Sequence, residues 1–460
     1  MTLSRRLVRR WRELRARPLP TPVAAAARLH LLDAIGVGHA ASAAMVGAPY
    51  RRYAATLATG GPASIFGIGS GAAAADAAMV NGGLIHSLEY DDTHAGSIVH
   101  GSAVLAAAAL AAGQAAGSSG AAMLTAYALG WEVLVRLGLA APGAFQAHGF
   151  QVTSVGGPLV AALIAADLHG LDEEQSIAAL GIALSQSSGV FEFLSNGSSV
   201  KSLHPGWAAH GGLIAAGLAA TGLTGPLTAI EGRYGLFASF AGDAAAPGRL
   251  DSLLADLGSV WHLADAAYKF HSCCHYIHPF IEATGILAAR GLTPEVVRRL
   301  LCRVPAGAAT IICEPWAAKQ APDTPHAARW SLPIAVATRL VHGRVDLASF
   351  EAPIPDAVRD LATRIAWEPL VDADFPRRFQ AEILCERNDG SSETVRIDDV
   401  YGNPSRPAGA ADVRAKFRVN AAQALPANRV DVLEAAIDGL EAAASLATLG
   451  NALSATSIPS

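Results

Sequence analysis

Residues 93–131 contain no Asp, Glu, Lys or Arg, and this long uncharged stretch limits what the chain can fold into. Small residues are abundant in it and in a second uncharged stretch, residues 210–230. Lipid-facing spans favour Leu, Ile, Val and Phe instead, and His94, His100 and Gln114 interrupt the first stretch. We therefore expect both stretches to be buried helices of a tight bundle, in which Ala and Gly let neighbouring helices approach closely.

The charge pattern argues against several classes of partner. The 460 residues carry a net charge of only -5, and no basic block of nucleic-acid-binding size lies beyond the N-terminus. The basic segment 5–17 is roughly amphipathic, and a solvated first helix is favoured over a membrane or partner contact. The next apolar run contains Arg28 and Asp33, so no signal peptide is expected. We expect neither a nucleic acid nor a membrane as a partner.

The cysteines indicate the redox compartment. The five are Cys273, Cys274, Cys302, Cys313 and Cys385. They form no Cys-x-x-Cys pair, and their density is far below that of small secreted domains held by disulfides. A reduced protein in the cytoplasm is therefore predicted.

Two kinds of sequence alternate along the chain and predict a mainly α protein with two domains. Residues 1–268 read as successive helices, and residues 406–460 return to Ala-rich helix. Between them, residues 269–405 carry more charge and show strand signals. We predict a large all-helical domain made of both chain ends, with a smaller α+β lid domain inserted at 269–405.

Local patterns predict individual elements. Thr21-Pro22 is typical of a helix start, and Gly36 and Gly38 are expected to end that helix. Asp172 with Gln175 forms a capping-box pattern. EVVRRLLCRV (295–304) and GAATIICEP (307–315) carry the branched residues of strands, and QAEILCERNDGSSETVRI (380–397) predicts a hairpin that turns at Asp389-Gly390.

The stretch HSLEYDDTHAGSIVH (86–100) concentrates groups that transfer protons. If a helix runs through it, Glu89 and Asp92 lie three residues apart and share a face. Carboxylates that close to each other shift each other's pKa, which suits a general acid or base. Thr93 adds a hydroxyl, and His100 adds an imidazole that titrates near neutral pH. The stretch is therefore a candidate catalytic site.

Two other interpretations of this stretch stay open. One is a helix terminus with capping acids and a solvated histidine, which the spacing alone favours. The other is a zinc site formed by Asp92, His94 and His100, although their spacing fits no compact metal motif.

The segment VKSLHPGWAAHGG (200–212) offers two potential cations beside a predicted helix start. Lys201 and His204 precede a helix that is expected to begin near Pro205. Cations next to a helix N-terminus favour binding of a carboxylate. The alternative is a surface loop with a solvated lysine.

The segment KFHSCCHYIHPF (269–280) combines three histidines, two cysteines and a lysine. A zinc site is one interpretation, but adjacent cysteines lack the usual two-residue gap. His275 and His278 lie three residues apart and can face a cleft together. Because the segment falls at a predicted domain boundary, it is a candidate lining of an interdomain crevice, where ligands commonly bind.

These segments also resemble a known family. HSLEYDDT, VKSLHPGWAAHGGLIAAGLAATGLTGPLTAIEGRYGLF, KFHSCCHYIHPF and PDTPHAARWSLPIAVATRLVHG follow one another as in the MmgE/PrpD family. That family includes 2-methylcitrate dehydratase, cis-aconitate decarboxylase and iminodisuccinate epimerase. The resemblance extends from LLDAIGV near the start to YGNPSRP and VRAKF near the end. It implies a helical domain with an α+β lid, a homodimer, and no metal or organic cofactor.

The resemblance also implies the site residues, position by position. The catalytic set would comprise Glu89, Thr93, His100, Lys201 and His278. Substrate contacts are expected from Asp92, Gln151, His204, His275 and His326.

The chain departs from the family pattern at several positions. Glu89 stands where an Asp is usual, and Gly101 follows His100 where the family usually has a proline. Gln151 stands where many of the lyases have a histidine, and His326 lies near a position often held by tyrosine. Losing one imidazole removes a candidate proton donor, so these departures bear on the reaction rather than on the fold.

The chemistry implied by the resemblance is proton transfer at a carbon next to carboxylates. Lys201, His204 and His278 would hold the carboxylates, and His100 or Glu89 would carry the proton. The leading expectation is a cofactor-independent lyase acting on a di- or tricarboxylate, with dehydration slightly ahead of decarboxylation. An epimerase of a dicarboxylate is the second class, and a family member that only binds a carboxylate is the third.

Overall fold

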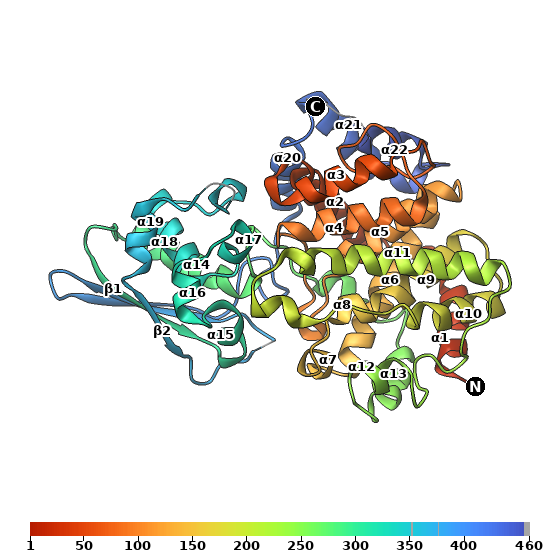
Figure 1. Ribbon diagram of the computed structural model, residues 1–460, viewed down its shortest axis with the longest axis horizontal. Helices are drawn as coiled ribbons and strands as arrows, with labels where there is room; N and C mark the ends of the chain where they lie inside the picture. Colours follow the sequence, from red (N-terminus) through yellow and green to blue (C-terminus); the bar gives the residue numbers. More distant parts are fainter. Residues whose placement is uncertain (351–352, 376, 455–460) are drawn as a thin grey trace.

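The computed structural model describes residues 1–350, 353–375 and 377–454. It has two bodies: a larger helical one that contains the first and the last described residues, and a smaller one built on a sheet (Figure 1). The predicted fold class, mainly α with a smaller α+β region, is confirmed.

The larger body has its own hydrophobic core, made by residues 3–266 and 417–453. Within it, α11 lies against α4, α9 and α10, and α20 lies along α2. Its described α-helices are α1 (Leu3–Arg15), α2 (Thr21–Ala43), α3 (Ala48–Leu57), α4 (Ala74–Ser87), α5 (Gly101–Ala115), α6 (Gly120–Ala140), α7 (Ala144–Ala147), α8 (Val152–Val155), α9 (Gly157–Leu168), α10 (Glu173–Leu184), α11 (Leu203–Ala220), α12 (Leu236–Phe240), α13 (Ala246–Leu254), α20 (Ala410–Ala421), α21 (Ala427–Asp438) and α22 (Ala447–Leu453).

The uncharged stretch 93–131 supplies the centre of this core, as expected. Every residue of α5 from Gly101 to Gly113 is buried, and so is most of α6. Among the described residues, α6 is the one helix that by itself is long and apolar enough to cross a membrane, and 89% of its most apolar window is buried inside the molecule. The helices α2 and α3 pass the same test only as a pair bent by 87°.

The second uncharged stretch, residues 210–230, is only half buried. Helix α11 ends at Ala220, and Leu218, Leu223 and Leu227 are exposed. The stretch is therefore helical only as far as Ala220, and its solvent-facing side is exposed, so the expectation of a fully buried helix is wrong.

Helix α2 does not end at Gly36 and Gly38, as the pattern predicted, but continues to Ala43. A Cβ atom at Gly36 would lie 2.9 Å from the ring of Phe417 in α20, and one at Gly38 would lie 2.4 Å from the ring of Phe66. Both glycines therefore permit close approach of neighbours and do not mark a helix end. The predicted capping box at the start of α10 is confirmed: Asp172 and Gln175 cap each other's backbone N–H.

The smaller body has a separate core, made by residues 273–397. Its described α-helices are α14 (His278–Ala289), α15 (Ala306–Ile312), α16 (Trp316–Gln320), α17 (Pro325–Ala328), α18 (Leu332–His342) and α19 (Asp356–Ala362). The described strands are β1 (Val297–Val304), β2 (Ile365–Pro369), β3 (Ala381–Arg387) and β4 (Ser392–Ile397), in the sheet order β2-β1-β3-β4.

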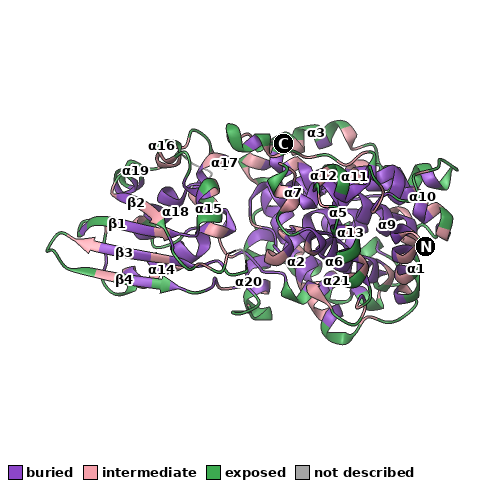
Figure 2. Cartoon of the chain, turned by 90° about the horizontal axis from the view of Figure 1, so that it is seen from below, coloured by how far each residue is buried: buried purple, intermediate pink, exposed green. Residues whose placement is uncertain are grey.

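The sheet is mixed, with β1 parallel to β2 and antiparallel to β3, and β3 antiparallel to β4. Ile383 of β3 lies opposite Cys302 of β1 and opposite Val395 of β4. Helix α14 packs on β3 and β4, and the turn from β3 to β4 is exposed (Figure 2). The hairpin predicted from Asp389-Gly390 and the strand predicted at 295–304 are confirmed.

The segment GAATIICEP forms helix α15 and not the predicted strand. Ala308, Ala309 and Ile312 are buried in it, a spacing that suits one face of a helix. Tertiary packing of this face overrides the β preference of the branched residues.

Candidate active site

A cavity of about 240 Å³ lies between the two bodies. The larger body contributes Glu89, Thr93, His100 and Lys201 to its lining, together with Gln151. The segment after residue 268 contributes Lys269, Cys274, His275, Tyr276 and Trp330. The cavity therefore brings together residues from distant parts of the chain. It lies at the predicted boundary near residue 269, where the helical sequence gives way to the more charged α+β segment.

The loop after α4 brings the first acid into the cavity. Helix α4 ends at Ser87, so no helix runs through residues 88–92, and the prediction that Glu89 and Asp92 share a helical face is wrong. Glu89 has a left-handed φ of 52°, a conformation that costs a non-glycine residue about 1–3 kcal/mol. This turn directs Glu89 into the cavity, whereas Asp92 is absent from its lining.

Backbone pairing fixes the loop beside the segment that leads to the smaller body. The N–H of Thr93 donates to the carbonyl of Ala267 at 3.0 Å, and the N–H of Ala267 donates back at 2.8 Å. The loop is closed by the N–H of His94, which donates to the carbonyl of Val99. Thr93 and Lys269 consequently line the same cavity.

Two lysines surround the Glu89 carboxylate. Lys201 Nζ donates to Glu89 Oε1 at 2.5 Å and lies 4.6 Å from the centre of the Trp330 ring. Lys269 Nζ lies 4.0 Å from Glu89 Oε2. Burial opposes ionisation of Glu89, but Lys201, with His86 and Lys269, outweighs burial and lowers the pKa of Glu89 to about 2. Glu89 is therefore a carboxylate at neutral pH.

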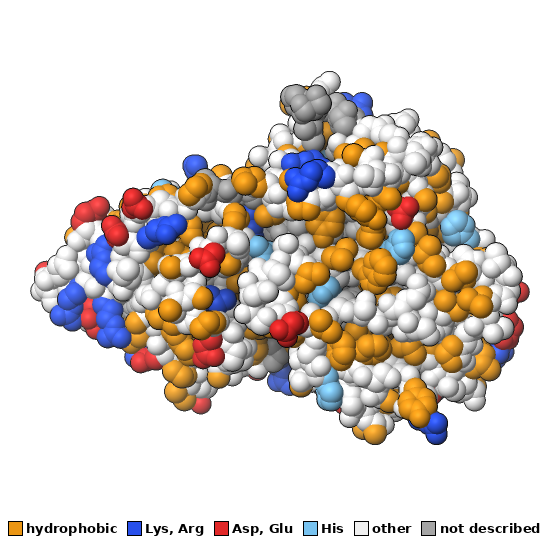
Figure 3. All heavy atoms as spheres, in the orientation of Figure 1, with side chains coloured by type: hydrophobic (Ala, Val, Ile, Leu, Met, Phe, Trp, Pro, Cys, Tyr) orange, Lys and Arg blue, Asp and Glu red, His pale blue; other side chains and the backbone are white. Residues whose placement is uncertain are grey.

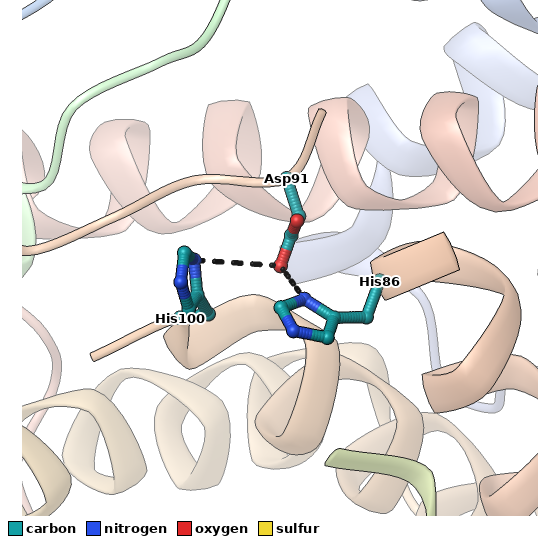
Figure 4. A group of neighbouring side chains, drawn as sticks. All are labelled: His86, Asp91 and His100. Carbon is teal, nitrogen blue, oxygen red and sulfur yellow. Dashed lines mark hydrogen bonds and ion pairs between the residues drawn. The ribbon is translucent and has the colours of Figure 1, made fainter. Parts of the chain in front are cut away.

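Asp91 forms a second buried cluster beside the first (Figure 4). Its Oδ2 lies 2.8 Å from Nδ1 of His86 and 3.8 Å from Nδ1 of His100, and its Oδ1 lies 4.0 Å from Lys269 Nζ. The rings of His86 and His100 have centroids 4.9 Å apart. This arrangement places one carboxylate among two imidazoles and an ammonium group.

His100 presents an unprotonated nitrogen. Its Nδ1 lies 3.1 Å from the carbonyl oxygen of Asp92, which only accepts, and 3.1 Å from the Thr93 hydroxyl. The proton of the neutral ring is therefore on Nδ1, and Nε2 carries a lone pair. Burial and the nearby Lys269 hold the pKa of His100 well below its usual range, although Asp91 acts in the opposite direction. The ring suits a general base.

Gly101, where the family usually has a proline, packs directly against a large side chain. A Cβ atom at this position would lie 2.5 Å from the ring of Trp131. A proline does not fit here without displacing Trp131, so glycine lets α5 begin immediately after His100.

Asp92 belongs to a buried network of the larger body. His30 Nδ1 lies 2.9 Å from Asp92 Oδ2, the backbone N–H of Ser102 donates to Oδ1 at 3.1 Å, and the Ser102 hydroxyl also contacts the carboxylate. Tyr127 in turn shares a hydrogen bond with Ser102. Asp92, which was expected to contact substrate, binds the start of α5 and is not among the residues that line the cavity.

The structure places Gln151 in the cavity and His204 behind it. Nδ1 of His204 donates to the Gln151 side-chain oxygen at 3.0 Å. Burial, with Lys201, lowers the pKa of His204 to about 4. A neutral imidazole therefore orients the Gln151 amide, and His204 offers little positive charge to a carboxylate.

The remaining predicted histidines lie in different places. His275 lines the cavity, and within the described part of the chain neither of its ring nitrogens has a hydrogen-bond partner. His278 lines a separate groove with His271. His326 lines an adjoining cavity of about 400 Å³ that shares Phe193, Leu194 and Trp330 with the first.

Two groups of side chains have the composition of metal ligands. His86, Asp91 and His100 form one, and His94, His262 and Asp265 form the other, with ligand atoms within 4.8 Å of one another in each. In the first group the Lys269 ammonium already supplies positive charge to Asp91. In the second, Nδ1 of His94 accepts the N–H of Ser97 at 3.2 Å. The zinc set of Asp92, His94 and His100 is not brought together.

Sequence reasoning missed Lys269, Asp91, His86 and Trp330. Asp91 lies in the segment 86–100 and Lys269 in the segment 269–280, both of which were predicted to carry site residues. Within these segments, a spacing of three residues favoured Asp92 and His278 instead. The left-handed turn at Glu89, which has no sequence signature in a non-glycine residue, changes which acids face the cavity.

Comparison with known proteins identifies the family of the chain. Residues 5–247 match the MmgE/PrpD N-terminal domain, and residues 271–442 match the MmgE/PrpD C-terminal domain. A cis-aconitate decarboxylase-like protein of Aspergillus oryzae is 28% identical, over 95% of this chain and 94% of its own. The cis-aconitate decarboxylase of Aspergillus terreus is 26% identical over 92% and 90%, and that of Mus musculus is 30% identical over 79% and 75%. The chain therefore belongs to the MmgE/PrpD family.

Proposed function

We propose that the protein is a cofactor-independent lyase that removes carbon dioxide, or alternatively water, from a di- or tricarboxylate held in this cavity. The observation that carries the proposal is the convergence of two buried ammonium groups, Lys201 and Lys269, with the neutral imidazole of His100 on one cavity. The names of the relatives support decarboxylation, which is therefore the leading reaction.

Decarboxylation needs a place for the electrons that the departing group leaves behind. The bond to the leaving carboxylate breaks, carbon dioxide departs, and the electron pair spreads onto the remaining carbon framework and its carboxylate. Lys201 and Lys269, both buried, stabilise this enolate-like charge. A proton from the Lys269 ammonium group then completes the product, so that one carboxylate is exchanged for one hydrogen.

Dehydration is the second candidate, and the state of His100 favours it. A neutral imidazole with a lone pair on Nε2 can remove a proton from the carbon next to a carboxylate. The C–O bond on the neighbouring carbon then breaks, and the imidazolium returns the proton to the departing oxygen, so that water leaves and the ring is neutral again. Thr93, within 3.1 Å of the same ring, is placed to orient the imidazole or the leaving hydroxyl.

Turnover in heavy water tests the proposal. A panel of di- and tricarboxylates is incubated with the wild-type enzyme and with His100→Ala, and products are identified by mass and NMR. We expect a product that has lost carbon dioxide or water. Loss of water should be greatly slowed in His100→Ala, whereas loss of carbon dioxide should depend on Lys269 and be slowed in Lys269→Ala, which is assayed alongside. Deuterium gained at carbon without any change in composition would indicate an epimerase instead. Binding without exchange or turnover would indicate a carboxylate-binding protein.

We also propose that two chains pair through the outer face of α11. Trp207, Ile214 and Leu218 are spaced to lie on one side of this helix, and each is 38–41% exposed. Figure 3 shows further hydrophobic side chains on the face of the larger body turned toward the viewer. Exposed apolar patches of this kind mark interaction sites, and closed two-fold pairing is the commonest way to cover them.

A further inference from the structure

We infer that the cavity takes a dicarboxylate with an apolar substituent in the place where a tricarboxylate carries its third carboxylate group. The inference rests on the proposed function, because it assumes that the site holds a carboxylate, and it names the substrate class of that site. Two features carry it: the balance of charge in the lining, and the apolar wall that faces the lysines.

The lining has little positive charge to offer. Among its described residues, the side chains with a formal charge are Lys201, Lys269 and Glu89, which leave one net positive charge. Behind them lie the buried Asp91 and Arg329, whose charges are opposite. The acids therefore neutralise most of the cationic charge before any substrate enters.

The other titratable groups of the lining are neutral. Burial and Lys269 hold the pKa of both His100 and His275 well below the usual range of histidine. Burial also raises the pKa of Cys274 to about 11 and that of Tyr276 further above its ordinary value. These groups can donate or accept hydrogen bonds, but they do not offset the charge of a carboxylate.

One net positive charge suits a single anchoring carboxylate. A second carboxylate that leaves as carbon dioxide loses its charge in the reaction, so a cation beside it would stabilise the substrate more than the transition state. The adjoining cavity adds the cation Lys319, but Glu314 and Asp323 line it as well and outweigh that charge. A third carboxylate would therefore be buried without a net counter-charge, which is strongly unfavourable.

Apart from the amide side chains of Gln146 and Gln151, the rest of the cavity is a hydrophobic wall. It is formed by Ile98, Phe191, Phe193, Leu194, Ile311 and Phe375, with the Trp330 ring beside Lys201. Phe193, Leu194 and Trp330 also line the adjoining cavity of about 400 Å³. An alkyl or aromatic substituent can therefore pack on this wall and extend toward the second cavity.

Three unreactive ligands test the inference by titration calorimetry on the full-length protein: succinate, 2-benzylsuccinate and tricarballylate. The last two are succinate with either an apolar or a charged substituent, so they differ only in the feature at issue. We expect 2-benzylsuccinate to bind about tenfold or more tightly than succinate, because the ring is removed from water. Tricarballylate is expected to bind no more tightly than succinate.

Two variants locate the effect. Phe193→Ala should remove most of the advantage of 2-benzylsuccinate while leaving the Kd for succinate within about twofold, whereas the exposed Tyr234→Ala control should change neither. Ile311→Lys adds a cation to the wall and should tighten tricarballylate about tenfold, while Ile311→Met should not.

The outcomes separate the inference from the proposed function. Tighter binding of tricarballylate than of 2-benzylsuccinate by the wild-type protein would overturn the inference and leave the carboxylate site intact. Failure of all three ligands to bind at millimolar concentration would overturn the proposed function and the inference with it. The expected order, lost in Phe193→Ala alone, would establish the apolar wall as the determinant of specificity.

Discussion

The ammonium group of Lys201 lies 2.5 Å from a carboxylate oxygen of Glu89, and both side chains are almost fully buried. The two residues are 112 positions apart in the chain, one in a loop and the other just before α11. A buried pair of this kind requires both partners, because either charge alone would be left in a medium that solvates it poorly.

We expect Lys201→Ala to lower kcat/KM, through both kcat and KM. The loss should correspond to about 2–5 kcal/mol of transition-state stabilisation. The variant leaves Glu89 unpaired and removes a counter-charge for the substrate. Steady-state kinetics on a reactive carboxylate measures the loss, with the exposed Arg298→Ala as a control. Kinetics close to wild type in Lys201→Ala would remove this lysine from the site.

The pKa of His100 is lowered by burial and by Lys269, so the neutral ring persists at lower pH than in an exposed histidine. If the ring is the base, kcat/KM should stay flat as the pH falls through 6.5, the ordinary value, and decline only well below it. A pH profile of kcat/KM from 4 to 8 tests this. A decline centred near 6.5 or above would show that another group controls the rate.

Asp92 and Thr93 are neighbours with different expected roles. Asp92→Ala should lower the free energy of unfolding by about 2–5 kcal/mol, because it strips His30 and Ser102 of a buried partner. Thr93→Val should cost about 1 kcal/mol or less in stability yet reduce kcat. Denaturant unfolding and steady-state kinetics are measured for both variants. Equal losses of stability in Asp92→Ala and Thr93→Val would contradict the expected difference in their roles.

Treatment with a chelator should leave activity unchanged, because lysine ammonium groups supply the positive charge at Glu89 and Asp91. The measurements are turnover before and after EDTA treatment, together with elemental analysis of the untreated protein. A stoichiometric zinc or iron that is lost along with activity would instead assign a metal to the group of His86, Asp91 and His100.

The outer face of α11 should control assembly. Light scattering at micromolar concentration is expected to give a dimer for the wild-type protein and a monomer for the double variant Ile214→Glu, Leu218→Glu, because two buried carboxylates would lack partners. The exposed Val432→Glu on α21 serves as the control. A dimer that survives the double substitution would place the interface elsewhere.

Much of the fold follows from local sequence. The Ala-rich uncharged stretch predicts α5 and α6 because a charge-free helix of small residues must be buried, and Asp389-Gly390 predicts the β3–β4 hairpin because that dipeptide suits a tight turn. Asp172 and Gln175 predict the start of α10 because their hydrogen bonds are local. Motif order along the chain was sufficient to identify the family.

Tertiary packing decided the rest. Gly36 and Gly38 remain inside α2 because Phe417 and Phe66 occupy the space beside them, and the residues of α15 become helical because one face is buried. The sequence around Gly36 and Gly38 does not reveal that Phe417 and Phe66 lie beside them.

The site shows the same division. The sequence determined which segments carry the chemistry, because acids, lysines and histidines cluster in them. Only the tertiary structure decided that Lys269 joins Glu89 in lining the cavity, while Asp92 and His278 do not. The left-handed backbone at Glu89 is a strained conformation that surrounding contacts impose, and contacts between residues over a hundred positions apart are set by packing and not by spacing.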